Sequence, residues 1–154
     1  TWRTARVKEA LEAQGKLGKA PLYFEYRLPT LAEWNMMFDS VKDLPNRIGA
    51  EGKRKFEGMY RFNMKRRQGD SMGVSGKLND NADITAPAKS YWPNDIGSYN
   101  IKGNVSEWVM DENKHIGGAW NTQMDSDVAV PIQLSGAAAN VDFRCVCEVA
   151  TQAP

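Results

Sequence analysis

From residue 46 onward, Gly, Asn, Asp or Pro interrupts the sequence every few residues, and this limits what the chain can fold into. Most stretches in between are too short for a helix, so the segment has few backbone hydrogen-bond ladders of its own. Its buried N–H and C=O groups need side chains, water or ions as partners. The pattern therefore predicts an α+β fold with little regular secondary structure.

Length and charge narrow the class of protein further. The 154 residues, 42% of them hydrophobic, suit one globular domain, which we place at residues 1–154. The 20 Lys and Arg residues against 19 Asp and Glu residues leave a net charge of +1. This balance gives no global attraction to nucleic acid or to an anionic membrane.

No apolar run is long enough to span a bilayer, and charges throughout residues 1–20 leave no room for the apolar core of a signal peptide. The chain begins without Met, so we expect it to be part of a precursor. We expect contact with a membrane only through a lipid anchor upstream of this chain.

Thr30 and Glu33 give the clearest local signal. They fit a capping box, in which the Thr hydroxyl accepts a hydrogen bond from the Glu backbone and the Glu carboxylate reaches back. The apolar face that follows carries Trp34, Met37, Phe38 and Val41. These features predict a helix over about residues 30–43, which Pro45 ends.

Other predicted elements are shorter. Residues 4–14 are typical of an amphipathic helix, and residues 22–26 of a strand. The apolar side of that helix carries Val7, Ala10 and Leu11. Two more strands are predicted at residues 117–120 and 141–149. Alternation places one set of the second strand's residues on one face: Val141, Phe143, Cys145, Cys147 and Val149.

Cys145 and Cys147 are one residue apart on that predicted strand. Such side chains share a face but lie too far apart to bridge easily, so we expect no disulfide between them. Together with the single histidine, His115, they make no convincing zinc site. We expect His115, which follows three charged or polar residues, to be an exposed turn residue.

Four blocks stand out along the chain: residues 27–34 (RLPTLAEW), 92–109 (WPNDIGSYNIKGNVSEWV), 117–120 (GGAW) and 143–145 (FRC). In the same order, they resemble the RLPTEAEWE, PPNxFGLYDMxGNVWEWV, GGSW and GFRC blocks of the formylglycine-generating-enzyme (sulfatase-modifying factor) family. The resemblance implies a compact fold related to C-type lectins. Family domains usually extend well upstream of the first block, so we expect this chain to be the C-terminal part of such a domain.

The resemblance also implies two structural calcium sites. One corresponds to Asn100, Glu107 and the backbone oxygens of Gly103 and Val105. The other corresponds to Asn63, Asp80 and the backbone oxygens of Met64 and Ala82, with Asp83 in place of Asp80 if the alignment of this loop shifts. Calcium binds carboxylate, amide and backbone oxygens, which these positions can supply. Spacing alone favours turn residues that cap the backbone without metal. With the resemblance, we expect calcium in at least one site and favour the first, where Gly103 permits a close backbone approach.

Catalysis is where the sequence departs from the active family members. Those enzymes hold copper through two cysteine thiolates, and the matching positions here are Thr122 and Asp127. Neither a hydroxyl nor a carboxylate replaces a thiolate for a soft metal. Cys145 matches a structural cysteine whose partner would lie upstream of residue 27, so we expect a small buried thiol. We therefore expect no copper and no enzymatic activity.

Two further patterns carry less weight. Residues 53–55 and 65–67 form a basic cluster with aromatic residues between them, a pattern that could contact nucleic acid or an acidic partner. We expect a solvated loop balanced by acids elsewhere, and no nucleic-acid partner. Residues 69–76 hold three glycines without a Walker lysine, which indicates a loop and not a phosphate cradle.

These observations favour a non-catalytic scaffold or protein-binding module. Within the family, residues 99–112 and 63–95 most resemble outer-membrane lipoproteins of gliding motility and type IX secretion. That resemblance implies a structural component of an envelope assembly, facing the periplasm or the cell surface, with other protein subunits as partners. The alternative is a metal-dependent oxidase of the formylglycine-generating or sulfoxide synthase type. Thr122 and Asp127 favour the scaffold.

Overall fold

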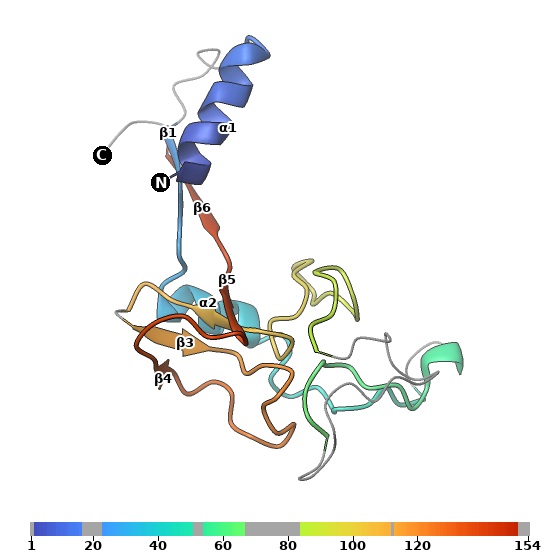
Figure 1. Cartoon of the computed structure of the whole chain (residues 1–154). Coiled ribbons are helices and arrows are strands. Elements are labelled where there is room, and N and C mark those ends of the chain that lie inside the picture. Colours follow the sequence, from blue (N-terminus) through green and yellow to red (C-terminus); the bar gives the residue numbers. More distant parts are fainter. Residues whose placement is uncertain (1, 17–22, 51–53, 67–83, 112, 151–154) are drawn as a thin grey trace.

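The computed structural model of the chain describes residues 2–16, 23–50, 54–66, 84–111 and 113–150 (Figure 1). The helices are α1 (Trp2–Ala13), α2 (Leu31–Phe38) and the 3₁₀ helix η1 (Arg54–Phe56). The strands are β1 (Tyr23–Arg27), β2 (Ser106–Trp108), β3 (Lys114–Ile116), β4 (Ile132–Gln133), β5 (Val141–Phe143) and β6 (Val146–Ala150). Irregular segments connect these short elements, which confirms the predicted α+β fold. None of the described helices is long and apolar enough to cross a bilayer.

The strands form two separate sheets. β2 is an inner strand of a four-stranded sheet ordered β4-β3-β2-β5, where it pairs antiparallel with β3 and parallel with β5. β1 and β6 pair antiparallel as a two-stranded ribbon. Figure 1 shows this ribbon and α1 standing off from a body that contains α2 and the four-stranded sheet. The body holds the hydrophobic core.

α2 begins as its capping box predicts. The Thr30 hydroxyl accepts a hydrogen bond from the Glu33 N–H at 3.2 Å, and the Glu33 carboxylate accepts one from the Thr30 N–H at 2.8 Å. The guanidinium of Arg27 donates to both Glu33 oxygens at 2.8 Å. This pairing, together with the Thr30 N–H, lowers the pKa of Glu33 to about 2. Arg27 is the last residue of β1, and its Nε also donates to Glu148 on β6 at 3.0 Å. The start of α2 is therefore linked through Arg27 to both strands of the ribbon.

The helix ends at Phe38 and not at the predicted residue 43. The N–H groups of Val41 and Leu44 bond to carbonyls three residues back, which changes the helix into tight turns. The Ser40 hydroxyl also donates to the Met37 carbonyl at 2.9 Å, and such a bond competes with the regular helical ladder.

Trp34 lies at the centre of the hydrophobic core. Its side chain is fully buried and stacks on Phe38, with 5.1 Å between ring centroids. The other buried core residues are Val41, Phe62, Met64, Ile101, Val109, Ile116, Met124 and Val128. The predicted apolar face of α2 is therefore confirmed, although Met37 is only half-buried.

The elements near the N-terminus agree with the sequence in outline. α1 confirms the predicted helix but buries little of its apolar side, since Val7 and Leu11 are half-buried and Ala10 is exposed. β1 confirms the predicted strand from residue 23 onward, and Leu22 lies outside the described residues.

Two strand predictions are wrong. Residues 117–120 form no strand, because Gly117 at φ +101° and Gly118 at φ +68° leave the extended conformation. Residues 141–149 are not one strand, because the chain breaks at Arg144 and Cys145 between two different sheets. The alternating residues therefore share no common face.

Gly103 is the position where a side chain would disturb this packing most directly. Its φ is +83°, and an added Cβ would lie 2.7 Å from the Asn63 carbonyl oxygen and 2.6 Å from the Met64 side chain. The backbone of Asn63 therefore approaches Gly103 closely, whereas the predicted approach of Gly103 to a calcium ion stays a prediction. Gly103→Ala should lower the free energy of unfolding by about 3 kcal/mol, through backbone strain and displaced neighbours.

Gly97 provides a matched control, because its φ of +81° is similar but no described atom lies within 4 Å of an added Cβ. Gly97→Ala should cost only the backbone strain, about 1 kcal/mol. Urea unfolding of both variants measures the difference. Equal losses would contradict the close contact between Gly103 and residues 63–64.

Candidate functional site

Glu107 on β2 is a buried carboxylate with only 5% of its surface exposed. The Arg144 guanidinium donates to it through Nη2 at 2.7 Å and through Nε at 3.1 Å to each oxygen. The indole Nε1 of Trp34 donates to Oε2 at 3.1 Å. An ionised carboxylate offers about four lone-pair positions, and these three N–H groups, one of them shared between both oxygens, occupy most of them. The charge of Glu107 is therefore paired inside the protein.

Arg144 connects three parts of the body. It lies at the break between β5 and β6, and beyond Glu107 it donates from Nη2 to the carbonyl of Tyr99 at 2.7 Å. A buried carboxylate is costly unless it is paired and hydrogen-bonded. The strand break places the Arg144 guanidinium where it pairs with the Glu107 carboxylate. The same guanidinium contacts the irregular segment before β2 through the Tyr99 carbonyl.

Asn104, a neutral side chain, also connects separate parts of the body through hydrogen bonds. It is buried, at φ +69°, and its amide oxygen accepts from the Asn63 amide at 3.0 Å and from the Ala86 N–H at 2.7 Å. Its amide nitrogen donates to the Ala86 carbonyl at 3.2 Å. Its own carbonyl accepts from the Trp120 N–H at 2.9 Å. One side chain and its backbone thus join three irregular segments that have no ladder of their own.

A cavity of about 550 Å³ opens beside these residues. Its lining consists of Thr85, Ala86, Ala88, Gly97, Ser98, Tyr99, Asn100, Asn104, Val105, Glu107, Asp142, Phe143 and Arg144. Three of the predicted calcium ligands, Asn100, Val105 and Glu107, are in this lining, and Gly103 is not. The structure therefore brings most of the first predicted site to one cavity.

The fit of calcium to this arrangement is poor. The lone pairs of Glu107 already accept from Arg144 and Trp34, and a calcium ion there would lie against a guanidinium. The Asn100 amide nitrogen donates to the Ala88 carbonyl at 3.1 Å, which leaves its oxygen as a ligand. Calcium could bind Glu107 only by displacing Arg144.

Only half of the second predicted calcium site can be described. The Asn63 amide nitrogen donates to the Ile84 carbonyl at 2.9 Å, and Met64 is buried in the core. Asp80 and Ala82 lie outside the described residues, as does the glycine-rich segment 69–76. Within the described ranges, no three His, Cys, Asp or Glu side chains are grouped as a metal site.

The two positions that match the family's copper ligands serve local turns. The Thr122 hydroxyl accepts from the Ala119 N–H at 2.9 Å. Asp127 is exposed, and its carboxylate accepts from the Ala129 N–H at 3.0 Å. Both side chains therefore stabilise the segment after β3.

The cysteines and the histidine differ in part from expectation. Cys145 is half-buried where burial was predicted, Cys147 is exposed, and both are free thiols. His115 is buried on β3, edge-on to the Trp108 ring, so the prediction of an exposed turn residue is wrong. Pairing of β3 with both β2 and β4 buries the imidazole, and that burial lowers its pKa.

The chain matches the sulfatase-modifying factor enzyme 1-like domain family over residues 5–149, and it belongs to that family. Among solved structures, CarF is 21% identical with a TM-score of 0.47, and the match covers 94% of this chain and 63% of that chain. Variable protein 1 of Treponema denticola is 20% identical with a TM-score of 0.47, covering 79% and 47%. This chain spans less than two thirds of either protein. No curated protein matches the sequence.

The Glu107–Arg144 pair can be tested against a second arginine of similar exposure. The side chains of Arg144 and Arg27 are 25% and 24% exposed, but their carboxylate partners differ: Glu107 is 6% exposed, whereas Glu33 is 35% and Glu148 is 56% exposed. Arg144→Met should lower the free energy of unfolding by about 3 kcal/mol, because it leaves a buried carboxylate unpaired.

Arg27→Met is the control, and it should cost much less because water can solvate the carboxylates it leaves. Chemical unfolding with a chelator present measures both variants without interference from metal. Equal losses in the free energy of unfolding for the two variants would contradict the prediction that burial of Glu107 makes its pairing with Arg144 more important for stability.

Proposed function

We propose that this family domain is a non-catalytic scaffold that works by binding other proteins. The observation that carries the proposal is the state of Thr122 and Asp127. Where the active family members are expected to hold copper with thiolates, these side chains accept hydrogen bonds within local turns. Copper(I) needs soft ligands, and neither oxygen group can replace them.

Exposed apolar side chains beside the cavity support a role in protein binding. Phe143 lines the cavity and is 62% exposed. Ile84 and Ile96, each next in sequence to a lining residue, are 49% and 64% exposed. Exposed apolar side chains that adjoin one cavity are candidates for contact with another protein.

The resemblance of residues 99–112 and 63–95 extends the proposal to a particular setting. We propose that the chain belongs to a gliding-motility or type IX secretion assembly, as part of an outer-membrane lipoprotein with its anchor upstream. Affinity purification of the full-length protein from native envelopes, followed by mass spectrometry, tests this. Subunits of such an assembly are expected, and their absence from an intact purified envelope complex would contradict it.

The absence of catalysis gives a direct prediction. With copper and oxygen present, the purified protein should leave a sulfatase-type cysteine peptide unchanged, as measured by peptide mass spectrometry. An active family member in the same assay is the positive control. Formation of formylglycine by this chain would contradict the proposal and favour the oxidase alternative.

Binding of copper(I) to the purified protein, measured by copper–thiolate absorption, provides a second test. The wild type should show no copper–thiolate absorption from the positions of Thr122 and Asp127. Cys147 is an exposed thiol that can bind copper by itself, so Cys147→Ser is the matched control. Absorption that survives this substitution would come from Cys145, the other thiol of the chain, and a stoichiometric copper(I) site there would contradict the proposal.

We propose that calcium binds the loop from Asn100 to Glu107 where Arg144 is displaced from Glu107, because the two cations compete for one carboxylate. Both would use the same oxygens of Glu107, so removing Arg144 should make the protein more responsive to calcium. At a hundredfold excess over its dissociation constant, calcium stabilises by about 2.7 kcal/mol, which is a shift of several degrees in melting temperature.

Thermal melts should therefore show a larger calcium response in Arg144→Met than in the wild type. Glu107→Gln should abolish the response, because it removes the charged ligand. A melt of Arg144→Met that is indifferent to both calcium and a chelator shown to strip bound metal would contradict calcium at this loop.

A further inference from the structure

The charges of this nearly neutral chain are separated along the sequence. Residues 46–67 hold eight of the 20 Lys and Arg residues but two of the 19 Asp and Glu residues, so this segment carries +6 and the rest of the chain −5. The described part, residues 46–50 and 54–66, is called the basic lobe below. Six described cations belong to it: Arg47, Arg54, Lys55, Arg61, Lys65 and Arg66.

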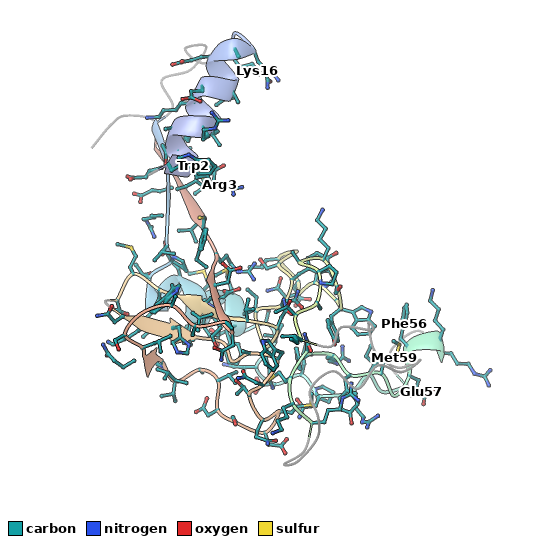
Figure 2. The ribbon with its side chains drawn as sticks, viewed as in Figure 1. Trp2, Arg3, Lys16, Phe56, Glu57 and Met59 are labelled. Atoms are coloured by element: carbon teal, nitrogen blue, oxygen red, sulfur yellow. The ribbon has the colours of Figure 1, made fainter. Side chains whose placement is uncertain are left out.

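The basic lobe is an ordered structure. Its two sides pair through a bridge between Arg47 and Tyr60, and the N–H groups of Ile48 and Arg61 bond across at 2.9 and 3.0 Å. η1 lies far from the four-stranded sheet in Figure 1. Figure 2 shows Phe56, Glu57 and Met59 at this end of the molecule, away from Trp2 and Arg3. Of the six cations, Arg47, Arg54 and Lys55 are exposed, and the other three are half-buried.

Aromatic rings hold several of these cations in place. The guanidinium carbons of Arg47 and Arg66 lie 3.9 and 4.4 Å from the centroid of the Tyr60 ring. The ammonium group of Lys55 lies 4.7 Å from the Phe56 ring, which meets Trp92 edge-on. Contact with a ring restricts a long side chain, so less conformational entropy is lost when it binds a ligand.

The lobe has binding capacity left over. Arg47, Arg54, Lys55 and Lys65 make no ion pair with any carboxylate in the described part of the chain. Arg47 donates to two neutral oxygens, the Gly58 carbonyl and the Tyr60 hydroxyl, which leaves three of its five N–H groups.

We propose that the basic lobe binds an acidic segment of a partner protein, a run of Asp and Glu side chains. Guanidinium groups fixed over a ring suit bidentate carboxylate binding. Single-stranded nucleic acid instead needs free aromatic faces for its bases, and here cations already contact Tyr60 and Phe56. The identity of the ligand as a protein segment rests on the proposed function.

Fluorescence anisotropy with a labelled Glu-rich peptide tests the proposal, with the same peptide carrying Gln for each Glu as the ligand control. The Glu peptide should bind, and its affinity should fall as ionic strength rises to about 0.15 M. Arg54→Gln with Lys55→Gln should weaken binding about tenfold. Arg47→Lys keeps the charge but loses the planar fork, and it should weaken binding less.

Arg3→Gln with Arg6→Gln, on α1, is the charge-matched control and should leave the affinity within about twofold. Equal loss in both double variants, or no binding of the Glu peptide at low salt, would overturn the proposal. Tighter binding of an oligonucleotide of equal charge would overturn it in favour of nucleic acid. None of these outcomes affects the formylglycine assay, so this proposal and the non-catalytic one can fail separately.

Discussion

The buried carboxylate of Glu107 is the constraint on which the rest of the body depends. It lies on an inner strand, against Trp34, the largest fully buried side chain of the described residues, and its charge must be paired there. Arg144 supplies the charge from the break between β5 and β6, and it also contacts the carbonyl of Tyr99. One ion pair thus fixes α2, β2, the strand break and an irregular segment relative to one another.

Around this pair, single side chains replace missing secondary structure. Asn104 forms hydrogen bonds with backbone groups of Ala86 and Trp120, which lie in irregular segments. The lack of a side chain at Gly103 and Gly117 lets the backbone come into contact with Asn63 and Trp34. None of these contacts involves Thr122 or Asp127, so the frame does not depend on the two positions that match the family's copper ligands. On the proposed function, this frame presents two surfaces, the cavity and the basic lobe.

The sequence predicted what depends on neighbouring residues and missed what depends on distant ones. The capping box and the buried face of α2 follow from residues within a few positions of Thr30. The partner of Glu107 lies 37 positions away, and nothing in the spacing indicated Arg144 or Asn104 as contacts. His115 was placed in solvent because its neighbours are polar, whereas pairing of β3 on both sides buries it. The blocks shared with the family supplied the fold that local patterns could not.

A double-mutant cycle between Glu107 and Arg144 tests this account most directly. Free energies of unfolding would be measured by urea denaturation, with a chelator present, for the wild type, Glu107→Gln, Arg144→Met and the double variant. If the two side chains are partners, the double variant should lose less than the sum of the single losses, with a coupling of about 2 kcal/mol. Losses that add to within about 0.5 kcal/mol would contradict the pair as the centre of the structure.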